Sequence, residues 1–363
     1  MKIAFYGSSL LSSYWNGAAT YYRGLLKALA ERGYTITFYE PDVYGRQEHR
    51  DIEPPDWCKV VVYSGTVEAL KEAAAKAGSA DIVIKASGVG FEDDLLLEEV
   101  LSNSHPKALK IFWDVDAPAT LAELKAAPQH PLRLALSSLD LVLTYGGGEP
   151  VVAAYRALGA KECVPIYNAL DPHTHHPVPK EERFVTDLFF LGNRLPDREA
   201  RVEEFFLKAA QTLPEKSFLL GGAGWSDRAF SSNLTYIGHV PTRDHNALNV
   251  SARAVLNVSR ESMAQNGFSP ATRVFEATGA GGCLITDHWE GIDRFFKPGE
   301  EILVARDGHD VAELVRHLTA EEAQAIGKRA LIRALSDHTY KQRAMTVDAL
   351  FKARLARSME AAE

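Results

Sequence analysis

The sequence predicts an α/β protein of two doubly wound, Rossmann-like domains, each built on a parallel sheet. Three observations lead to this prediction. Short apolar runs alternate with helical segments in both halves of the chain, as strands and crossover helices do. The segment Tyr167–Lys180, rich in proline and histidine, separates the halves. The chain has 363 residues, which is enough for two domains of ordinary size.

The first half begins with a βαβ unit. Lys2–Tyr6 predicts a buried strand, the apolar positions of Ala18–Leu29 recur at helical spacing, and Tyr34–Tyr39 predicts a second strand. A right-handed crossover makes two such strands parallel. Further strands are expected at Lys59–Tyr63, Asp81–Lys85, Lys110–Trp113, Leu139–Tyr145 and Cys163–Ile166, with helices at Val67–Ala77, Asp93–Leu101 and Pro150–Leu158.

The second half repeats this alternation and ends in a long amphipathic helix from about Tyr340. We predict a first domain of residues 1–175, completed by the C-terminal helix 340–363, and a second domain of residues 176–339. We expect the two sheets to face each other across a cleft that holds the site. Strands are expected at Asp187–Leu191, Ser217–Leu220, Leu234–Ile237, Ala254–Val258, Cys283–Thr286 and Ile302–Ala305, with helices at Arg198–Gln211 and Val311–Leu318.

The composition excludes several classes of protein. The formal net charge of −8 gives no electrostatic reason to bind nucleic acid. The 3 cysteines are odd in number and far apart, which argues against a disulfide framework and a zinc site and favours a reducing compartment. We see no signal peptide and no membrane span, so we expect a cytoplasmic protein; peripheral contact with a membrane is not excluded. The sequence specifies no oligomeric state.

The segment Asn266–Asp287 is predicted to form a loop, a helix, a glycine turn and a strand. Ser269 is the expected N-cap, followed by a proline at the first helical position. One side of this helix would then carry Ser269 together with Thr272, Arg273 and Glu276. A helix start that carries an arginine and, further along, a carboxylate suits a ligand with an anionic and a hydroxylated part. A surface helix with its Arg/Glu face in water is the alternative.

Three histidines, His173, His175 and His176, lie in the linker. An irregular, proline-flanked loop without helical spacing is more typical of a solvated connection than of a metal site. We therefore expect no metal ligands here.

Five segments carry a further pattern: Val164–Pro177, Leu188–Arg198, Gly238–Val240, Leu256–Asp287 and Phe295–Asp307. Together they resemble the hinge and C-terminal domain of glycosyltransferases of the GT-B fold, and among these the group related to the spore maturation protein CgeB. The resemblance implies a GT-B glycosyltransferase that moves a sugar from a nucleotide diphosphate sugar, with UDP favoured, to a hydroxyl group of a carbohydrate, glycolipid or protein. It also implies no essential metal and no cofactor beyond the nucleotide sugar as co-substrate.

The resemblance also implies roles for residues of the second domain. Glu276 would accept hydrogen bonds from the ribose hydroxyls, because one carboxylate accepts two at once. Arg273, Arg260 and Arg194 would neutralise the diphosphate, with a solvated surface charge as the alternative for each. Arg198 matches the pattern too, although it would equally brace its own helix. The other residues expected around the donor are Asn193, His239, Asn266, Gly267, Phe268, Ser269 and Thr272.

Two positions depart from the family pattern. Many retaining relatives carry a second glutamate eight positions before Glu276, where this chain has Phe268, and the hinge glycine is Ala169. The missing carboxylate leaves the donor sugar and the stereochemistry open.

Acceptor and catalytic roles are expected in the first domain. Asp114 and Asp116 follow a predicted strand, and one of them would be the general base that deprotonates an acceptor hydroxyl. An Asx turn before Pro118 is the alternative. The loop after the first strand would border the donor sugar or the acceptor through Gly7, Ser8, Asn16 and Gly17.

Two other functions stay open at this stage. A sugar-nucleotide epimerase has the same architecture, although the first domain shows no cluster of acids and histidines to support one. A non-catalytic module that binds a sugar nucleotide or a protein partner is the other. A dehydrogenase is disfavoured because neither half has the G-x-G-x-x-G fingerprint.

Overall fold

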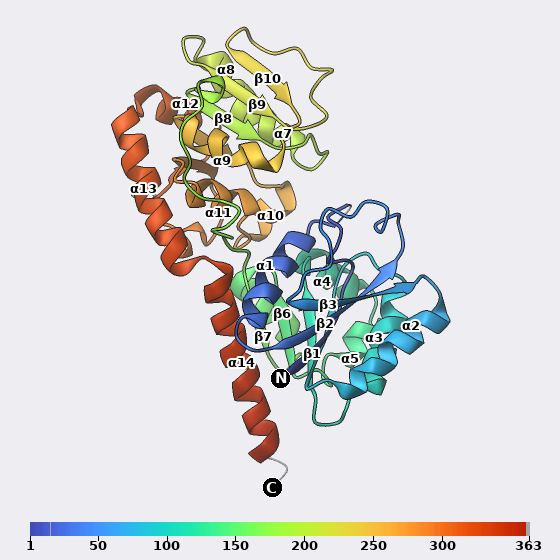
Figure 1. Ribbon diagram of the computed structural model, residues 1–363. Helices are drawn as coiled ribbons and strands as arrows, with labels where there is room; N and C mark the ends of the chain where they lie inside the picture. The colour runs from blue at the N-terminus through green and yellow to red at the C-terminus, as the bar shows by residue number, and fades with distance from the viewer. Residues whose placement is uncertain (15, 361–363) are drawn as a thin grey trace. The chain divides into compact units, whose positions relative to one another are not determined.

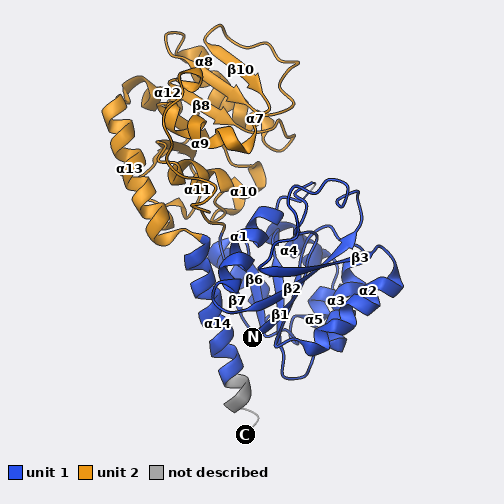
Figure 2. Cartoon of the chain, viewed as in Figure 1, with its two compact units in different colours: residues 1–167, 340–363 blue, residues 168–339 orange. Residues whose placement is uncertain are grey.

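The computed structural model describes residues 1–14 and 16–360, with side chains through residue 356. The chain forms two compact units, shown in different colours in Figure 2. Unit 1 comprises Met1–Tyr167 and the C-terminal segment from Tyr340, and unit 2 comprises Asn168–Thr339. The first division therefore lies eight residues before the predicted one. Leu170 packs within unit 2, where its backbone N–H donates to the carbonyl of His338 at 2.7 Å.

The sheet of unit 1 is entirely parallel, and its strands run in the order β3-β2-β1-β4-β5-β6-β7 (Figure 1). β1 lies between β2 and β4, so the strand order reverses at β1. The strands are β1 (Lys2–Tyr6), β2 (Thr35–Asp42), β3 (Cys58–Ser64), β4 (Ile82–Ala86), β5 (Leu109–Asp114), β6 (Leu141–Thr144) and β7 (Cys163–Pro165). Each lies where the sequence predicted a strand, within three residues at either end.

Helices connect these strands. Two were not predicted, α4 and α5. α4 buries Ala117, Leu121 and Leu124 at helical spacing, but alanines on its other faces blur the pattern, and prolines close to both helices suggested a loop. The helices of unit 1 are α1 (Ala19–Ala30), α2 (Val67–Ala74) with the 3₁₀ turn Ala75–Ser79, α3 (Asp93–Asn103), α4 (Ala117–Ala126), α5 (Pro131–Ala135), α6 (Gly148–Ala157) and α14 (Tyr340–Glu360).

The C-terminal helix α14 packs against α1. Gly24 on α1 leaves room for the ring of Tyr340, since a Cβ at Gly24 would lie 2.2 Å from that ring. Asp348 on α14 accepts a hydrogen bond from the Tyr34 hydroxyl at 2.7 Å and forms an ion pair with Arg32. The end of the chain thus completes the unit that its beginning forms.

The sheet of unit 2 is also entirely parallel, with the order β10-β9-β8-β11-β12-β13 (Figure 1). Its core includes side chains on both faces of the sheet, as the continuous apolar runs predicted. The strands are β8 (Leu188–Leu191), β9 (Phe218–Gly221), β10 (Leu234–Gly238), β11 (Ala254–Asn257), β12 (Leu284–Asp287) and β13 (Leu303–Ala305).

Several helices of unit 2 were not predicted. α13 carries a signal that was overlooked, a capping box in which Thr319 and Glu322 satisfy each other's backbone N–H groups. The helical segments are α7 (Glu199–Val202), a π-helical turn (Glu203–Leu207), α8 (Lys208–Thr212), α9 (Thr242–Ser251), α10 (Glu261–Asn266), α11 (Thr272–Gly279), α12 (Gly308–His317), α13 (Ala320–Asp337) and 3₁₀ turns at Glu182–Phe184 and Ile292–Arg294.

The predicted start of α11 is wrong. Ala271 has an extended backbone with ψ of 153°, so the helix begins at Thr272 and Ser269 is not its N-cap. The hydroxyl of Thr272 instead accepts a hydrogen bond from Asn168 at 2.9 Å. Thr272, Arg273 and Glu276 still share the helix, whereas half-buried Ser269 lies in the preceding loop. No helix among the described residues is long and apolar enough to cross a membrane.

Candidate functional site

The strand order of unit 2 reverses at β8, which lies between β9 and β11. The loops that leave β8 and β11 therefore diverge, and an open α/β sheet binds its ligands at such a point. The loop after β8 ends at Arg198, and the turn after β11 carries Ser259 and Arg260. This edge of the sheet is the candidate site.

At this edge of the sheet, the charges of two arginines affect the pKa of a third. Burial lowers the pKa of the Arg198 guanidinium, and the charges of Arg260 and Arg273 lower it further, while Asp197 opposes them. Gly192 makes room for Arg198, because a Cβ there would lie 2.8 Å from Nη2. Nε of Arg198 and Nε of Arg273 are buried and have no hydrogen-bond partner in the described part of the chain. We call Arg198, Arg260 and Arg273 the arginine group, and it suits a diphosphate.

Glu276 lies one turn after Arg273 on α11. Nη1 of Arg273 is 3.2 Å from Oε2 of Glu276, and Nε2 of His175 is 3.9 Å from Oε1. Burial raises the pKa of Glu276, but Arg273, His175 and His245 together outweigh burial and hold it below its ordinary value. Glu276 is therefore ionised at neutral pH, and its oxygens can accept hydrogen bonds from hydroxyl groups.

Asp287, at the end of β12, is a site residue that the sequence analysis did not single out. Its Oδ1 accepts hydrogen bonds from the backbone N–H and the hydroxyl of Ser259, both at 3.1 Å, and its Oδ2 pairs with Arg201 at 2.6 Å. It thus holds the turn that carries Arg260. Burial raises the pKa of Asp287, although Arg201 and Ser259 oppose this. The signal was a carboxylate directly after the apolar residues of a strand.

Replacing Asp287 by Asn should destabilise the protein by about 3 kcal/mol, because it removes the buried charge that pairs with Arg201 at 2.6 Å and leaves Arg201 only the half-exposed Glu261 at 3.3 Å. Urea unfolding followed by tryptophan fluorescence measures this loss, since Trp225 and Trp289 are both buried in unit 2. Asp293→Asn is the matched control, because Asp293 is exposed and has no side-chain partner in the described residues. Equal stability of the two variants would contradict the role of Asp287.

Other predicted donor residues have partners within the protein. Arg194 is not among the charges that act on Arg198, and its guanidinium pairs with Asp227 at 2.9 Å and with Glu199 at 2.6 Å. Arg260 of the arginine group also has a carboxylate partner, Asp197 at 2.5 Å, although its side chain is half exposed. Oδ1 of Asn193 accepts a hydrogen bond from the N–H of Ala223 at 2.9 Å, which links the loops after β8 and β9. His239 is exposed at the end of the edge strand β10.

The loop between α10 and α11 is shaped by packing. Phe268 has a positive φ of 46° and is buried, and Arg294 lies over its ring at 4.7 Å. Gly291 makes this packing feasible, since a Cβ there would lie 2.1 Å from the Phe268 ring. Gly267 also has a positive φ, of 65°, and Asn266 donates to the carbonyl of Ser262 at 2.6 Å. Phe268 thus forms an aromatic contact between two loops.

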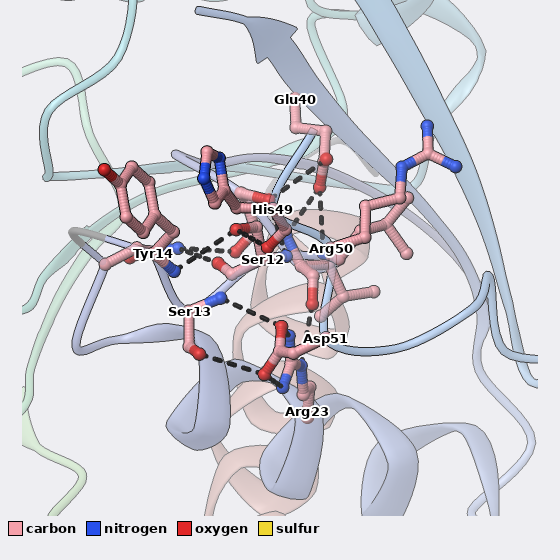
Figure 3. Close-up of polar contacts among 12 residues, drawn as sticks. Ser12, Ser13, Tyr14, Arg23, Glu40, His49, Arg50 and Asp51 are labelled. Atoms are coloured by element: carbon pink, nitrogen blue, oxygen red, sulfur yellow. Dashed lines mark hydrogen bonds and ion pairs between the residues drawn. The ribbon is translucent and has the colours of Figure 1, made fainter. Parts of the chain in front are cut away.

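In unit 1, two carboxylates hold the loop after β1 in place (Figure 3). Oε2 of buried Glu40 accepts hydrogen bonds from the backbone N–H groups of Leu10 at 2.5 Å and Leu11 at 3.3 Å. Asp51 binds the guanidinium of Arg23 at 2.7 and 2.9 Å and accepts bonds from the hydroxyl and backbone N–H of Ser13, on the same loop. The loop therefore has a fixed shape at the carboxyl end of β1.

The predicted residues of this loop differ in accessibility. Ser8 and Asn16 are buried and hydrogen-bond each other at 3.0 Å, so their side chains shape the loop from within. A Cβ at Gly7 would lie 2.7 Å from Phe38, which explains the glycine. Gly17 is exposed, with no atom within 4 Å of a Cβ at that position.

The two candidate bases are in different environments. Asp114 is fully buried and accepts hydrogen bonds from the hydroxyls of Ser87, Thr120 and Tyr155. Burial raises its pKa, although these hydrogen bonds oppose the shift. Asp116 is exposed at the N-cap of α4, and no side-chain partner contacts its carboxylate among the described residues. Only Asp116 is open to a substrate.

The comparisons with known proteins agree with this geometry. Residues 198–349, which include the arginine group, Glu276 and Asp287, match a family model described as glycosyl transferase-like. No curated protein sequence matches the chain. The part of the chain that carries the candidate site is thus similar to glycosyltransferases.

Solved structures share the fold over nearly the whole chain. Sucrose-phosphate synthase from Thermosynechococcus elongatus superposes with a TM-score of 0.70 at 14% identity, covering 98% of this chain and 100% of that one. HepE from Anabaena, in complex with UDP and glucose, gives 0.67 at 14% identity, covering 97% and 100%. BGT of phage T4, in complex with its UDP-glucose substrate, gives 0.55 at 12% identity, covering 99% of each chain. These matches confirm the predicted fold class, two Rossmann-like units of the GT-B type.

Proposed function

We propose that this protein is a glycosyltransferase that binds a nucleotide diphosphate sugar on unit 2, with a UDP-sugar favoured, and transfers the sugar to a hydroxyl acceptor without an essential metal. The observation that carries the proposal is the arginine group beside the ionised Glu276 at the switch point of the sheet. The finer likeness to the CgeB-related group is part of this proposal.

Each donor residue has a role that follows from its charge. Glu276 accepts hydrogen bonds from the ribose hydroxyls, as an ionised carboxylate does well. The arginine group neutralises the diphosphate, whose charge increases as the bond to the anomeric carbon breaks. Three fixed cations supply the stabilisation for which other enzymes use a metal ion.

The acceptor step needs a base. The acceptor oxygen forms a bond to the anomeric carbon, the bond from that carbon to the diphosphate breaks, and the acceptor proton passes to a carboxylate. Asp116 is our candidate for that base because it is exposed, whereas Asp114 is buried and hydrogen-bonded. The acceptor is a hydroxyl of a carbohydrate, glycolipid or protein.

The choice of UDP rests on the structural relatives. HepE is described with UDP and with UDP-glucose, and T4 phage BGT with UDP-glucose. The family match favours transfer over epimerisation, because its description is that of a glycosyl transferase.

A thermal-shift panel tests the proposal. UDP-, GDP-, dTDP- and ADP-sugars and CMP-sugars are compared, and at about a hundred times its dissociation constant the correct donor should add roughly 2.7 kcal/mol of stability. We expect the UDP-sugars to give the largest shift, unchanged by EDTA. No shift with any donor would overturn the proposed site, and a shift abolished by EDTA would overturn its independence of metal.

A further inference from the structure

Three potential metal ligands from separate segments meet beside the arginine group. They are His175 of the linker, His245 of α9 and Glu276 of α11, and their ligand atoms all lie within 4.8 Å of one another. From the sequence, His175 was expected to lie in a solvated linker and to bind no metal. The structure instead buries it, while its neighbour His176 is exposed.

The hydrogen bonds of His245 leave one nitrogen available for a ligand. Its Nε2 is 3.3 Å from the carbonyl oxygen of Val240. Because a carbonyl can only accept, Nε2 carries the proton and the lone pair is on Nδ1. Nδ1 is buried and has no hydrogen-bond partner in the described part of the chain. A backbone carbonyl that orients a histidine in this way is a common feature around metal-binding histidines.

His175 presents a second nitrogen of the same kind. Its Nε2 is buried, has no hydrogen-bond partner among the described residues, and lies 3.9 Å from Oε1 of Glu276. Buried polar atoms in proteins nearly always have a partner, so two unpartnered nitrogens in one cluster with a carboxylate call for a ligand.

The charge around the cluster sets the affinity. Arg273 contacts Oε2 of Glu276 at 3.2 Å and leaves Oε1 facing His175. Its charge repels a metal ion, while Asp171 provides a negative charge near His175. Two histidines and one glutamate form a donor set that Zn²⁺ commonly uses, with a fourth position left for water.

We propose that His175, His245 and Glu276 bind a divalent transition metal ion such as Zn²⁺, and that the ion and the nucleotide compete for Glu276. The metal site stands on its own geometry, whereas the competition rests on the proposed function, because it requires Glu276 to bind the ribose. The ion would thus inhibit donor binding and take no part in the transfer.

The test begins with Co²⁺, which reports its coordination through visible absorption. The wild-type protein should bind one Co²⁺ with the intense bands of a low-coordinate site. His175→Ala and His245→Ala should each weaken binding about tenfold or more. His176→Ala is the matched control, since His176 is exposed on the same linker, and it should bind as the wild type does. Thermal melting checks that each variant is folded. The Co²⁺ spectrum of the wild type tests the metal site even if a variant does not fold.

Competition is measured by calorimetry of UDP with and without Zn²⁺. Zn²⁺ should weaken UDP binding to the wild type and leave UDP binding to His245→Ala unchanged. Because UDP itself also complexes Zn²⁺ in both experiments, comparing the two proteins corrects for that effect. No Co²⁺ binding, or equal binding by all the variants, would overturn the metal site even if UDP binds. Co²⁺ binding that does not affect UDP would overturn the competition. Co²⁺ binding by a protein that binds no nucleotide would overturn the proposed function and leave the metal site intact.

Discussion

Replacing Glu276 by Gln should weaken UDP-sugar binding on the order of 100-fold. Hydrogen bonds to a charged group are each worth about 1.5–3 kcal/mol, and the proposed ribose contact contains two of them. Calorimetry with the UDP-sugar selected by the donor panel measures the change. The ionised state of Glu276 makes the effect large, because a neutral amide accepts fewer and weaker bonds.

Glu300→Gln is the control for this experiment. Its side chain is 66% exposed and contacts only Lys297 at 3.8 Å, so we expect unchanged affinity. A similar affinity in the Glu276 and Glu300 variants would exclude the ribose assignment. Thermal melting without ligand separates a binding defect from unfolding.

Replacing Arg273 by Ala should reduce kcat/KM by about 100-fold or more, since removing one fixed group that stabilises transition-state charge costs roughly 3 kcal/mol. Much of the loss should fall on kcat, because the diphosphate gains charge as it leaves. Steady-state kinetics of donor turnover measure both parameters. Arg273 also contacts Glu276, so its removal should raise the pKa of that carboxylate.

Arg306→Ala is the control for the loss of an arginine. Arg306 is 80% exposed and pairs with Asp310 on the following helix, α12, so its variant should keep wild-type kinetics. A rise in KM with unchanged kcat in the Arg273 variant would mean that this residue binds the donor without acting on the departing diphosphate.

The pattern of apolar runs predicted every strand of both sheets, because a parallel strand buried on both faces has few polar residues. Some of the helices, in contrast, were not predicted. α9 buries Asn246 and Asn249, so its inner face is polar and its periodicity is weak. α13 was overlooked although its capping box is visible in the sequence.

The candidate site likewise combines residues whose proximity follows from the sequence with residues that only the fold brings together. Arg273 and Glu276 lie one turn apart on α11, so their proximity follows from helical spacing alone. Arg198 and Arg260 lie near them only because the strand order brings the ends of β8 and β11 together. Asp287 became a site residue through its hydrogen bonds to Ser259, which no local pattern encodes.

The sequence by itself determined the two parallel sheets, the family resemblance and the pairing of an arginine with a carboxylate on one helix, because these depend on local periodicity and short spacings. Tertiary structure alone decided which charges act on one another. It paired Arg194 with Asp227 and buried Asp114, and it brought His175 to Glu276 across about a hundred residues of chain. The physical reason is that contacts between distant segments depend on strand order and on which side chains are buried, and neither is specified by spacing along the chain.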